Sequence, residues 1–106
     1  MIEIETGSTN VYEDLGIVNA AEMQIKARLA TKISEIIKHR HLTQTEAAEI
    51  LGMSQPKVSG MLRGQFRGVS EAKMLECLNR LGRDVEIVVR KPSRSRATGR
   101  LSVTFA

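Results

Sequence analysis

The chain is organised around residues 43–64, which read TQTEAAEILGMSQPKVSGMLRG. Thr43 followed by Glu46 is the pattern of a capping box, in which two side chains satisfy free N–H groups at a helix start. This pattern predicts a short helix over 44–51. Gly52 then stands where the helix end requires a left-handed residue, a conformation that glycine adopts at little cost.

A second short helix is predicted over about 54–63. Ser54 is a candidate N-cap, and Pro56 falls in the first turn, where its missing N–H is harmless. Val58 and Leu62 are spaced i, i+4 and are expected to pack this helix onto the first one. Two short helices joined by a tight turn are typical of a helix-turn-helix.

The outer face of the second helix predicts a site for double-stranded DNA. The N-terminal end of such a helix enters the major groove, where Gln and Arg side chains read base edges and Lys contacts phosphate. The start of the helix over 44–51 is a further candidate phosphate site, because its N–H groups are free and its dipole is positive there. Arg67, in the following loop, is either a phosphate contact or a solvated loop cation. The candidate DNA-binding residues are Gln44, Thr45, Ser54, Gln55, Lys57, Ser59, Arg63 and Arg67.

Helical patterns flank this pair on both sides. Asn19 followed by Glu22 is another capping-box pattern and predicts a long amphipathic helix over about 20–39. A fourth helix is predicted over about 71–81, with three leucines at helical spacing on one face. Cys77 lies in this helix and is expected to be a small buried hydrophobe rather than a catalytic or redox group.

The period of the hydrophobic pattern changes after the fourth helix. Apolar residues alternate over 84–90 and again over 101–105, so two short strands are predicted. The first strand is either the edge of a hairpin within one chain or pairs with its copy across a two-fold axis. An uncovered Val-Ile-Val edge promotes aggregation, which favours pairing and hence a homodimer. The expected fold is all-α with a short C-terminal β-strand or hairpin.

The chain has 106 residues, a size typical of one small domain, and its net charge of +4 is unevenly distributed. Residues 1–18 hold four acidic and no basic groups, whereas 19–82 and 83–106 each carry a net charge of +4. The sequence predicts a flexible acidic N-terminal segment over 1–18, a DNA-binding domain over 19–82 and a β and basic tail over 83–106. The basic parts fit a polyanion, and the acidic segment fits a basic protein unless it is solvated without a partner. The basic run within 90–100 is interpreted as general phosphate attraction or plain solubility.

Several classes of function are not expected. No apolar run is long enough for a transmembrane helix, and the acidic start differs from a secretory signal. A single cysteine fits a reducing compartment, so a cytoplasmic protein, associated with the nucleoid when bound to DNA, is expected. His39 and His41 lack neighbouring metal ligands, and no nucleophile–base pair or phosphate-cradling glycine loop is visible. We therefore expect no cofactor, no metal, no membrane association and no enzymatic activity.

The run from Gln44 to Ser59 resembles the helix-turn-helix of the phage-repressor family (Cro/cI-like, or XRE). The resemblance covers roughly 20–82 and implies a bundle of four to five helices that binds double-stranded operator DNA. Two residues depart from the pattern: Gly60 lies inside the second helix, which costs up to about 1 kcal/mol, and Arg63 stands where the family often has Glu. The matching residues are Gln44, Glu46, Ala48, Leu51, Gly52, Ser54, Val58, Ser59 and Gly64.

The flanking segments resemble the XRE-type antitoxins of bacterial toxin–antitoxin systems. The resemblance rests on residues 10–16 (NVYEDLG), 64–68 (GQFRG) and 81–87 (LGRDVEI). Such antitoxins are typically dimers that repress their own operon and neutralise a basic ribonuclease toxin. The resemblance implies a sequence-specific repressor that is also an antitoxin, with 1–18 as the toxin-binding segment. An ordinary XRE-type or phage regulator without a toxin partner is the alternative, and a structural or RNA-binding module is a further one.

Overall fold

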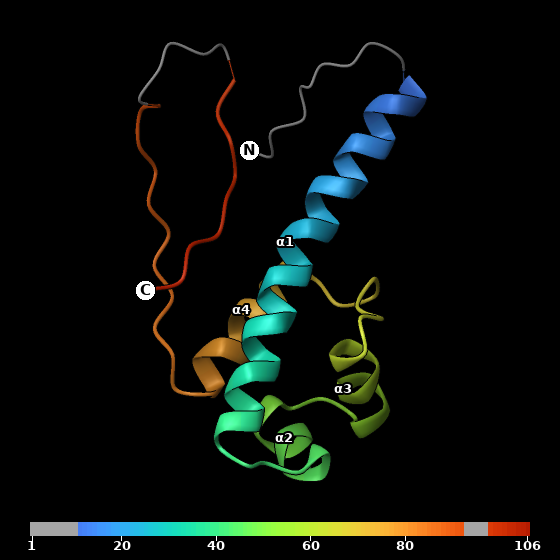
Figure 1. Ribbon diagram of the computed structural model, residues 1–106, viewed down its shortest axis with the longest axis vertical. Coiled ribbons are helices and arrows are strands. Elements are labelled where there is room, and N and C mark those ends of the chain that lie inside the picture. Colours follow the sequence, from blue (N-terminus) through green and yellow to red (C-terminus); the bar gives the residue numbers. More distant parts are fainter. Residues whose placement is uncertain (1–10, 93–97) are drawn as a thin grey trace. The chain divides into compact units, whose positions relative to one another are not determined.

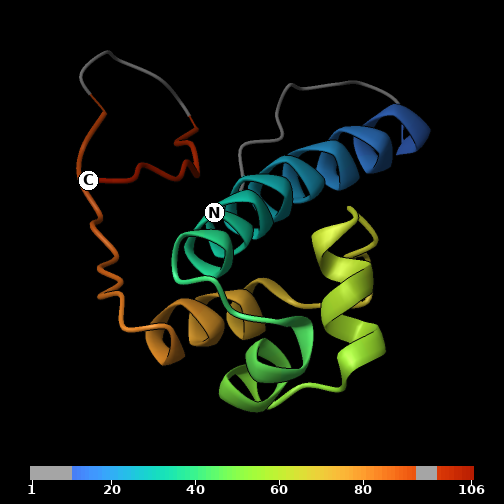
Figure 2. The same cartoon turned by 60° about the horizontal axis from the view of Figure 1, so that its bottom comes forward.

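The computed structural model describes residues 11–92 and 98–106 (Figure 1). The chain divides into two compact units. One of them, Lys26–Glu86, contains the C-terminal part of the first of four helices and all of the remaining three. Figure 2 shows α2 lying against both α3 and α4 within that unit. The described ranges contain no strand and four α-helices, which are α1 (Val11–His39), α2 (Gln44–Leu51), α3 (Gln55–Leu62) and α4 (Glu71–Arg80).

The caps predicted for the two short helices are confirmed. The hydroxyl of Thr43 accepts a hydrogen bond from the N–H of Glu46 at 3.0 Å, and the Glu46 carboxylate accepts one from the N–H of Thr43 at 2.8 Å. At the start of α3, the hydroxyl of Ser54 accepts the N–H of Lys57, and Pro56 lies in the first turn. Each cap stabilises its helix by about 1 kcal/mol, so local interactions fix where α2 and α3 begin.

The core of the Lys26–Glu86 unit receives side chains from all four helices. A fully buried aliphatic side chain stabilises the fold by about 1.5–3 kcal/mol relative to an exposed one. Cys77 is buried as predicted, whereas Met61 and Met74 are core residues that the spacing arguments did not single out. The largest fully buried side chains are Ile33, Leu51, Val58, Met61, Met74 and Cys77.

α1 begins at Val11, well before the start predicted near residue 20, so that prediction is wrong. The capping-box pattern of Asn19 and Glu22 lies inside the helix. A capping box forms only where the chain enters a helix, because helical residues upstream supply carbonyls for the same N–H groups. Of the segment 1–18 that was expected to be flexible, residues 11–18 lie in α1 and residues 1–10 lie outside the described ranges. None of the helices that the structure describes is long and apolar enough to cross a membrane.

The strands predicted over 84–90 and 101–105 are wrong for the chain by itself, although the helical part of the prediction is confirmed. Residues 83–92 and 98–106 contain no strand. A strand requires backbone hydrogen bonds to a neighbouring strand. Side-chain alternation only places the apolar residues on one face and does not provide those hydrogen bonds. Ile87 and Val89 are 78% and 91% exposed, so the apolar face of this segment stands open.

Gly60 lies inside α3 at a buried position, and it has room for a side chain. A Cβ at this residue would meet atoms of Gln65 at 3.5–3.7 Å, which are ordinary van der Waals distances. Gly52 differs from Gly60 both in its backbone conformation and in the space available for a side chain. Its φ of 67° lies in the left-handed region, and a Cβ there would lie only 3.0 Å from Nη1 of Arg80.

We predict that G60A raises the free energy of unfolding by about 0.5–1 kcal/mol, because alanine has a higher helix propensity and fits the available space. Thermal and urea unfolding followed by circular dichroism measure the change. G52A is the matched control and should lower the free energy of unfolding by about 1–2 kcal/mol, because a side chain is strained at that φ. A G60A variant less stable than the wild type would contradict the space found at this position.

Candidate nucleic-acid interface

The turn between α2 and α3 determines the orientation of α3 relative to α2. Gly52 has φ 67° and ψ 36°, and the N–H of Met53 donates to the carbonyl of Ala48 at 3.1 Å. Arg80 of α4 donates to the carbonyl of Ile50 at 3.3 Å, which satisfies one of the carbonyls left free at the end of α2. The turn is therefore held by its own backbone and by a side chain from another helix.

Glu76 positions Arg80 at this turn. The Nε of Arg80 donates to the Glu76 carboxylate at 2.8 Å, and Nζ of Lys73 lies 3.5 Å from the same carboxylate. The hydrogen bond from Arg80, followed by the charge of Lys73, lowers the pKa of Glu76 below its ordinary value. This cluster was not predicted from the sequence, although the i, i+4 spacing of Glu76 and Arg80 on one helix is a signal for it.

α3 packs onto the core through Val58 and Met61, which are 0% and 1% exposed. The prediction for Val58 is confirmed. Leu62 is half-buried, so the predicted i, i+4 pair is confirmed only in part, and Met61, three residues after Val58, is the second fully buried side chain. Both spacings lie on one side of a short helix, and the angle at which α3 crosses its neighbours selects between them.

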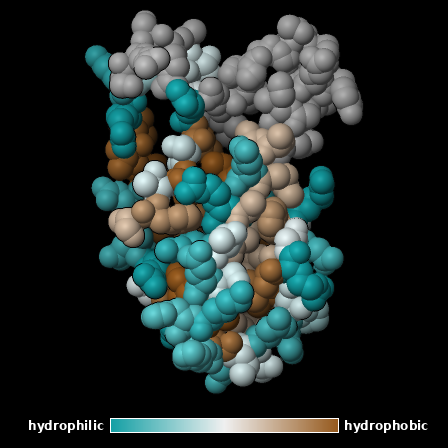
Figure 3. Space-filling view, in the orientation of Figure 1, coloured by the Kyte–Doolittle hydropathy of each residue, from teal (hydrophilic) through white to brown (hydrophobic). Residues whose placement is uncertain are grey.

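The residues predicted to bind DNA lie mainly at the surface. They come from the first turn of α2, from α3 with its N-cap, and from the loop that follows α3. Figure 3 shows that hydrophilic side chains predominate over the end of the molecule where α2 lies. Ser59 is half-buried, and the exposed members of the set are Gln44, Thr45, Ser54, Gln55, Lys57, Arg63 and Arg67.

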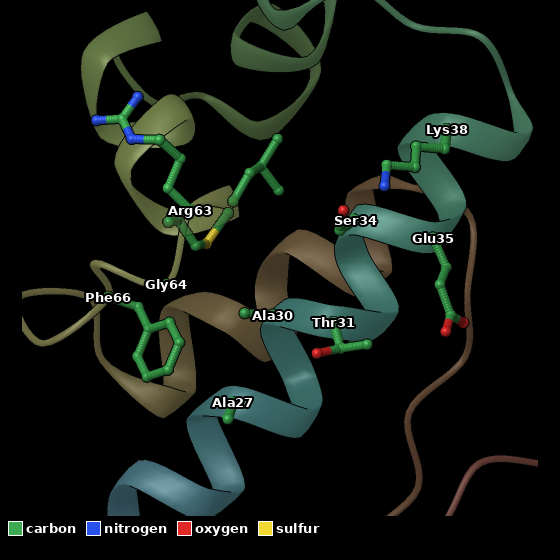
Figure 4. Close-up of a pocket in the computed structure, with 11 residues that line it drawn as sticks. Ala27, Ala30, Thr31, Ser34, Glu35, Lys38, Arg63, Gly64 and Phe66 are labelled. Carbon is green, nitrogen blue, oxygen red and sulfur yellow. The ribbon is translucent and has the colours of Figure 1, made fainter.

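Two of the predicted residues, Ser59 and Arg63, are hydrogen-bonded to each other. Nη1 of Arg63 donates to the hydroxyl of Ser59 at 2.5 Å, and Nη2 donates to Oε1 of Gln65 at 3.5 Å. Figure 4 shows Arg63 pointing away from α1. An exposed guanidinium can exchange these partners for a ligand, whereas the hydroxyl of Ser54 is already used as the cap of α3. In this structure the Ser54 hydroxyl fixes the start of α3, and the Ser59 hydroxyl holds the Arg63 side chain.

The charge around α3 is uniformly positive along the sequence. Between Glu49 and Glu71 the chain has no acidic residue and three basic ones, Lys57, Arg63 and Arg67. The backbone of the loop is held by α1, because Nζ of Lys26 donates to the carbonyl of Arg67 at 3.3 Å. This arrangement favours a polyanion such as the phosphate backbone of nucleic acid.

A groove of about 500 Å³ lies between the starts of α3 and α4. Lys57 and Lys73 line it from the two helices, so its charge continues the positive character of α3. Glycines, serines and two apolar side chains form the rest of the wall, so the two lysines are the charged groups that line the groove. The remaining lining residues are Gly52, Met53, Ser54, Gly68, Val69 and Ser70.

A second groove, of about 570 Å³, lies between α1 and the end of α3 (Figure 4). Ala27, Ala30 and Thr31 form part of one wall, and Gly64 and Phe66 form part of the other. The walls are mostly small or apolar, and Arg63 points away from α1. Ser34, Glu35 and Lys38 of α1 add polar groups to the first wall, and no candidate DNA-binding residue except Arg63 lines this groove.

Clusters of metal-ligating side chains and the single cysteine are the other candidates for chemistry in the part of the chain that the structure describes. No cluster of three or more His, Cys, Asp or Glu side chains there could hold a metal ion. Cys77 is fully buried, and its Sγ contacts Sδ of Met53 at 3.7 Å. Burial raises the pKa of the Cys77 thiol, so it stays protonated at neutral pH and acts as a core residue.

Comparisons with known proteins agree with this geometry. A family model described as "Helix-turn-helix domain" matches residues 11–90, which include all four helices. A solved structure named "Putative XRE Family Transcriptional Regulator" superposes with a TM-score of 0.77 and 44% sequence identity, covering 83% of this chain and 99% of the other. No curated protein matches the chain.

We predict that E76Q lowers the free energy of unfolding at pH 7, because a neutral amide cannot pair as a charge with the Arg80 guanidinium. A carboxylate with a lowered folded-state pKa stabilises the fold above its unfolded pKa and loses that effect as the pH falls through the folded pKa. The difference from the wild type should therefore shrink as the pH falls below the ordinary pKa range of a glutamate. Urea unfolding at a series of pH values measures it, with E49Q on the exposed side of α2 as control. A difference that stays constant down to pH 3 would contradict the pairing.

Proposed function

We propose that this chain, which belongs to the helix-turn-helix domain family and is an XRE-type transcriptional regulator, represses transcription by placing α3 in the major groove of a specific operator. One observation carries the proposal. Val58 and Met61 are buried on one side of α3, while Gln55 and Lys57 are exposed at its N-terminal end. A helix held in this way offers its polar side to the DNA without unfolding.

Gln55 and Lys57 are assigned different roles. The amide of Gln55 presents a donor and an acceptor together, which is the pattern that pairs with an adenine edge in the major groove. Lys57 is a compact charge on a flexible stem, which suits a phosphate better than a base. Arg63 is assigned to base reading as well, once it exchanges Ser59 and Gln65 for a guanine.

The first turn of α2 and the loop after α3 are assigned to the phosphate backbone. Gln44 and Thr45 are exposed where the N–H groups of α2 point outward. The capping box occupies the N–H groups of Thr43 and Glu46, so the N–H groups of Gln44 and Thr45 are the ones assigned to a phosphate, beside the charge of Glu46. Arg67 stands in a loop whose backbone is anchored by Lys26, and we assign its side chain to a phosphate.

Replacing the two exposed residues at the start of α3 tests these roles. Q55A should weaken operator binding by about 1–3 kcal/mol and relax discrimination at one base pair. K57A should weaken binding to all duplexes alike and reduce the slope of log K against log salt by about one unit. Gel-shift titrations with the upstream region of the gene, at two salt concentrations, measure both effects.

Q24A and K38A, at exposed positions of α1, are the matched controls for these two substitutions. They should leave binding within about twofold of the wild type. If neither Q55A nor K57A changes duplex binding, α3 is not the reading helix. Competition by structured RNA that equals competition by duplex DNA would instead favour an RNA-binding module.

We further propose that the regulator acts as a homodimer. A single short helix reads few base pairs, and a second copy related by a two-fold axis reads a second half-site about 34–36 Å away. The operator is then a palindrome whose half-sites are one helical turn apart. The basic run within 90–100 is assigned to general phosphate attraction, with plain solubility as the alternative.

An antitoxin role is the finer form of the proposal. Residues 1–18 hold four acidic groups and no basic one, which complements a basic toxin. Binding of the toxin there and of the operator at α3 would join neutralisation and autorepression in one chain. A regulator without a toxin partner remains the alternative, and a small basic open reading frame beside the gene separates the two. The apolar residues available to anchor a toxin are Ile2, Ile4, Val11, Tyr12, Leu15 and Ile17.

Deleting residues 1–18 tests this assignment. The deletion should abolish toxin neutralisation and leave operator binding within about twofold of the wild type, because the Lys26–Glu86 unit is untouched. Growth rescue and gel shifts measure the two activities. A full-length variant with E3Q, E5Q, E13Q and D14N is the control that removes charge and keeps the apolar residues. Neutralisation by the deleted chain would rule out the segment as the toxin-binding site.

A further inference from the structure

The segment from Arg83 to Lys91, RDVEIVVRK, is an apolar strand pattern that lies open at the surface. Val85, Ile87, Val88 and Val89 are 37%, 78%, 59% and 91% exposed. Figure 1 shows the segment as a drawn-out trace, and no strand is assigned to residues 83–92 or 98–106. Exposed apolar surface of this kind marks a contact with another chain, and an open strand edge is the usual template for one.

We propose that residues 84–90 pair antiparallel with the same segment of a second copy, with the two-fold axis passing through Ile87. This inference specifies the interface of the homodimer under the proposed function. It does not depend on DNA, because it follows from the order of residues in one segment and from their exposure.

The apolar face of the segment is matched to itself in this register. Val85, Ile87 and Val89 project to one side of a strand, because side chains alternate. An antiparallel partner centred on Ile87 places the partner's Val89 opposite Val85 and the partner's Ile87 opposite Ile87. Three apolar side chains from each copy then form one continuous stripe, and cross-strand pairs of β-branched residues stabilise a sheet.

The charges on the other face are also complementary. In the same register Asp84 lies opposite the partner's Arg90, and the reverse pair forms at the other end of the ladder. Glu86 lies opposite the partner's Val88 and so meets no like charge. Arg83 would face the partner's Lys91, and this repulsion ends the ladder at residues 84 and 90.

Neighbouring registers match the apolar side chains and the charges less well. A pairing centred on Glu86 places two glutamates opposite each other, which is unfavourable. A pairing centred on Val88 keeps an opposite-charge pair, Glu86 with the partner's Arg90, but places Val85 opposite the partner's Lys91. Only the register centred on Ile87 matches every apolar residue of the stripe with another. A segment that complements itself about one residue is what a two-fold interface requires, which favours a second copy over an unrelated protein.

Disulfide trapping of the full-length protein tests the register. I87C should form a covalent dimer on mild oxidation, because two residues on the axis are directly opposite and within the Cα separation that a disulfide spans. V88C is the matched control and should form little dimer, because residue 88 of one copy is diagonal to residue 88 of the other at about 7–8 Å. The wild type controls for Cys77, which is fully buried. Covalent dimer from V88C and not from I87C would overturn the register.

Charge exchange gives an independent readout. D84R alone and R90D alone should each raise the dimer dissociation constant about tenfold, because each places like charges opposite one another. The double variant D84R/R90D should return to within about threefold of the wild type. The pair E86R/R90E is the control, because rescue by this exchange belongs to the register centred on Val88. Analytical ultracentrifugation without DNA measures all of them.

Three further outcomes would contradict the homodimer, the proposed interface or both. A monomer that binds its operator as one half-site removes both the homodimer and this interface, yet leaves DNA reading by α3 intact. A dimer that neither I87C traps nor the charge exchange affects overturns this interface alone. A monomeric I87C/V103C chain that closes an internal disulfide instead identifies a hairpin with residues 101–105, which also overturns the proposal.

Discussion

The direction of α3 depends on the left-handed conformation of Gly52. With φ at 67°, the chain reverses after α2, and the N–H of Met53 returns to the carbonyl of Ala48. Arg80 of α4 then donates a hydrogen bond to the carbonyl of Ile50 at the end of α2. The turn is thus held by a backbone hydrogen bond and by the Arg80 side chain. As a result, α3 packs with Val58 and Met61 toward the core and with Gln55 and Lys57 exposed. The candidate interface is a consequence of this one turn.

Two acidic residues near the interface, Glu46 and Glu76, stabilise the helices that form it. Glu46 accepts the N–H of Thr43 and so completes the capping box at the start of α2. Glu76 holds Arg80, which in turn satisfies a carbonyl at the end of α2. The chain from residue 50 to residue 70 carries no acid of its own. Negative charge therefore supports the positions of the helices, while positive charge remains available to a polyanion.

The sequence predicted α2, α3 and α4 closely because their starting signals are local. Thr43 and Ser54 cap α2 and α3 through hydrogen bonds that reach only three residues ahead, so the pattern and the bond coincide. The cap predicted at Asn19 is wrong, since a capping-box pattern inside a longer helix has no free N–H groups to satisfy. Of the candidate site, exposure agreed with prediction for all residues except Ser59, whose hydroxyl instead orients Arg63.

By itself the sequence determined the caps, the reversing glycine, the positive charge of α3 and the alternation over 84–90, because each depends on residues only a few positions apart. Tertiary structure alone decided that Met61 rather than Leu62 enters the core, and that Arg80 reaches from α4 to Ile50. It also decided that the apolar segment around Ile87 remains open. These outcomes depend on where separate elements cross, and helix crossing and strand pairing are set by surfaces that are distant along the chain.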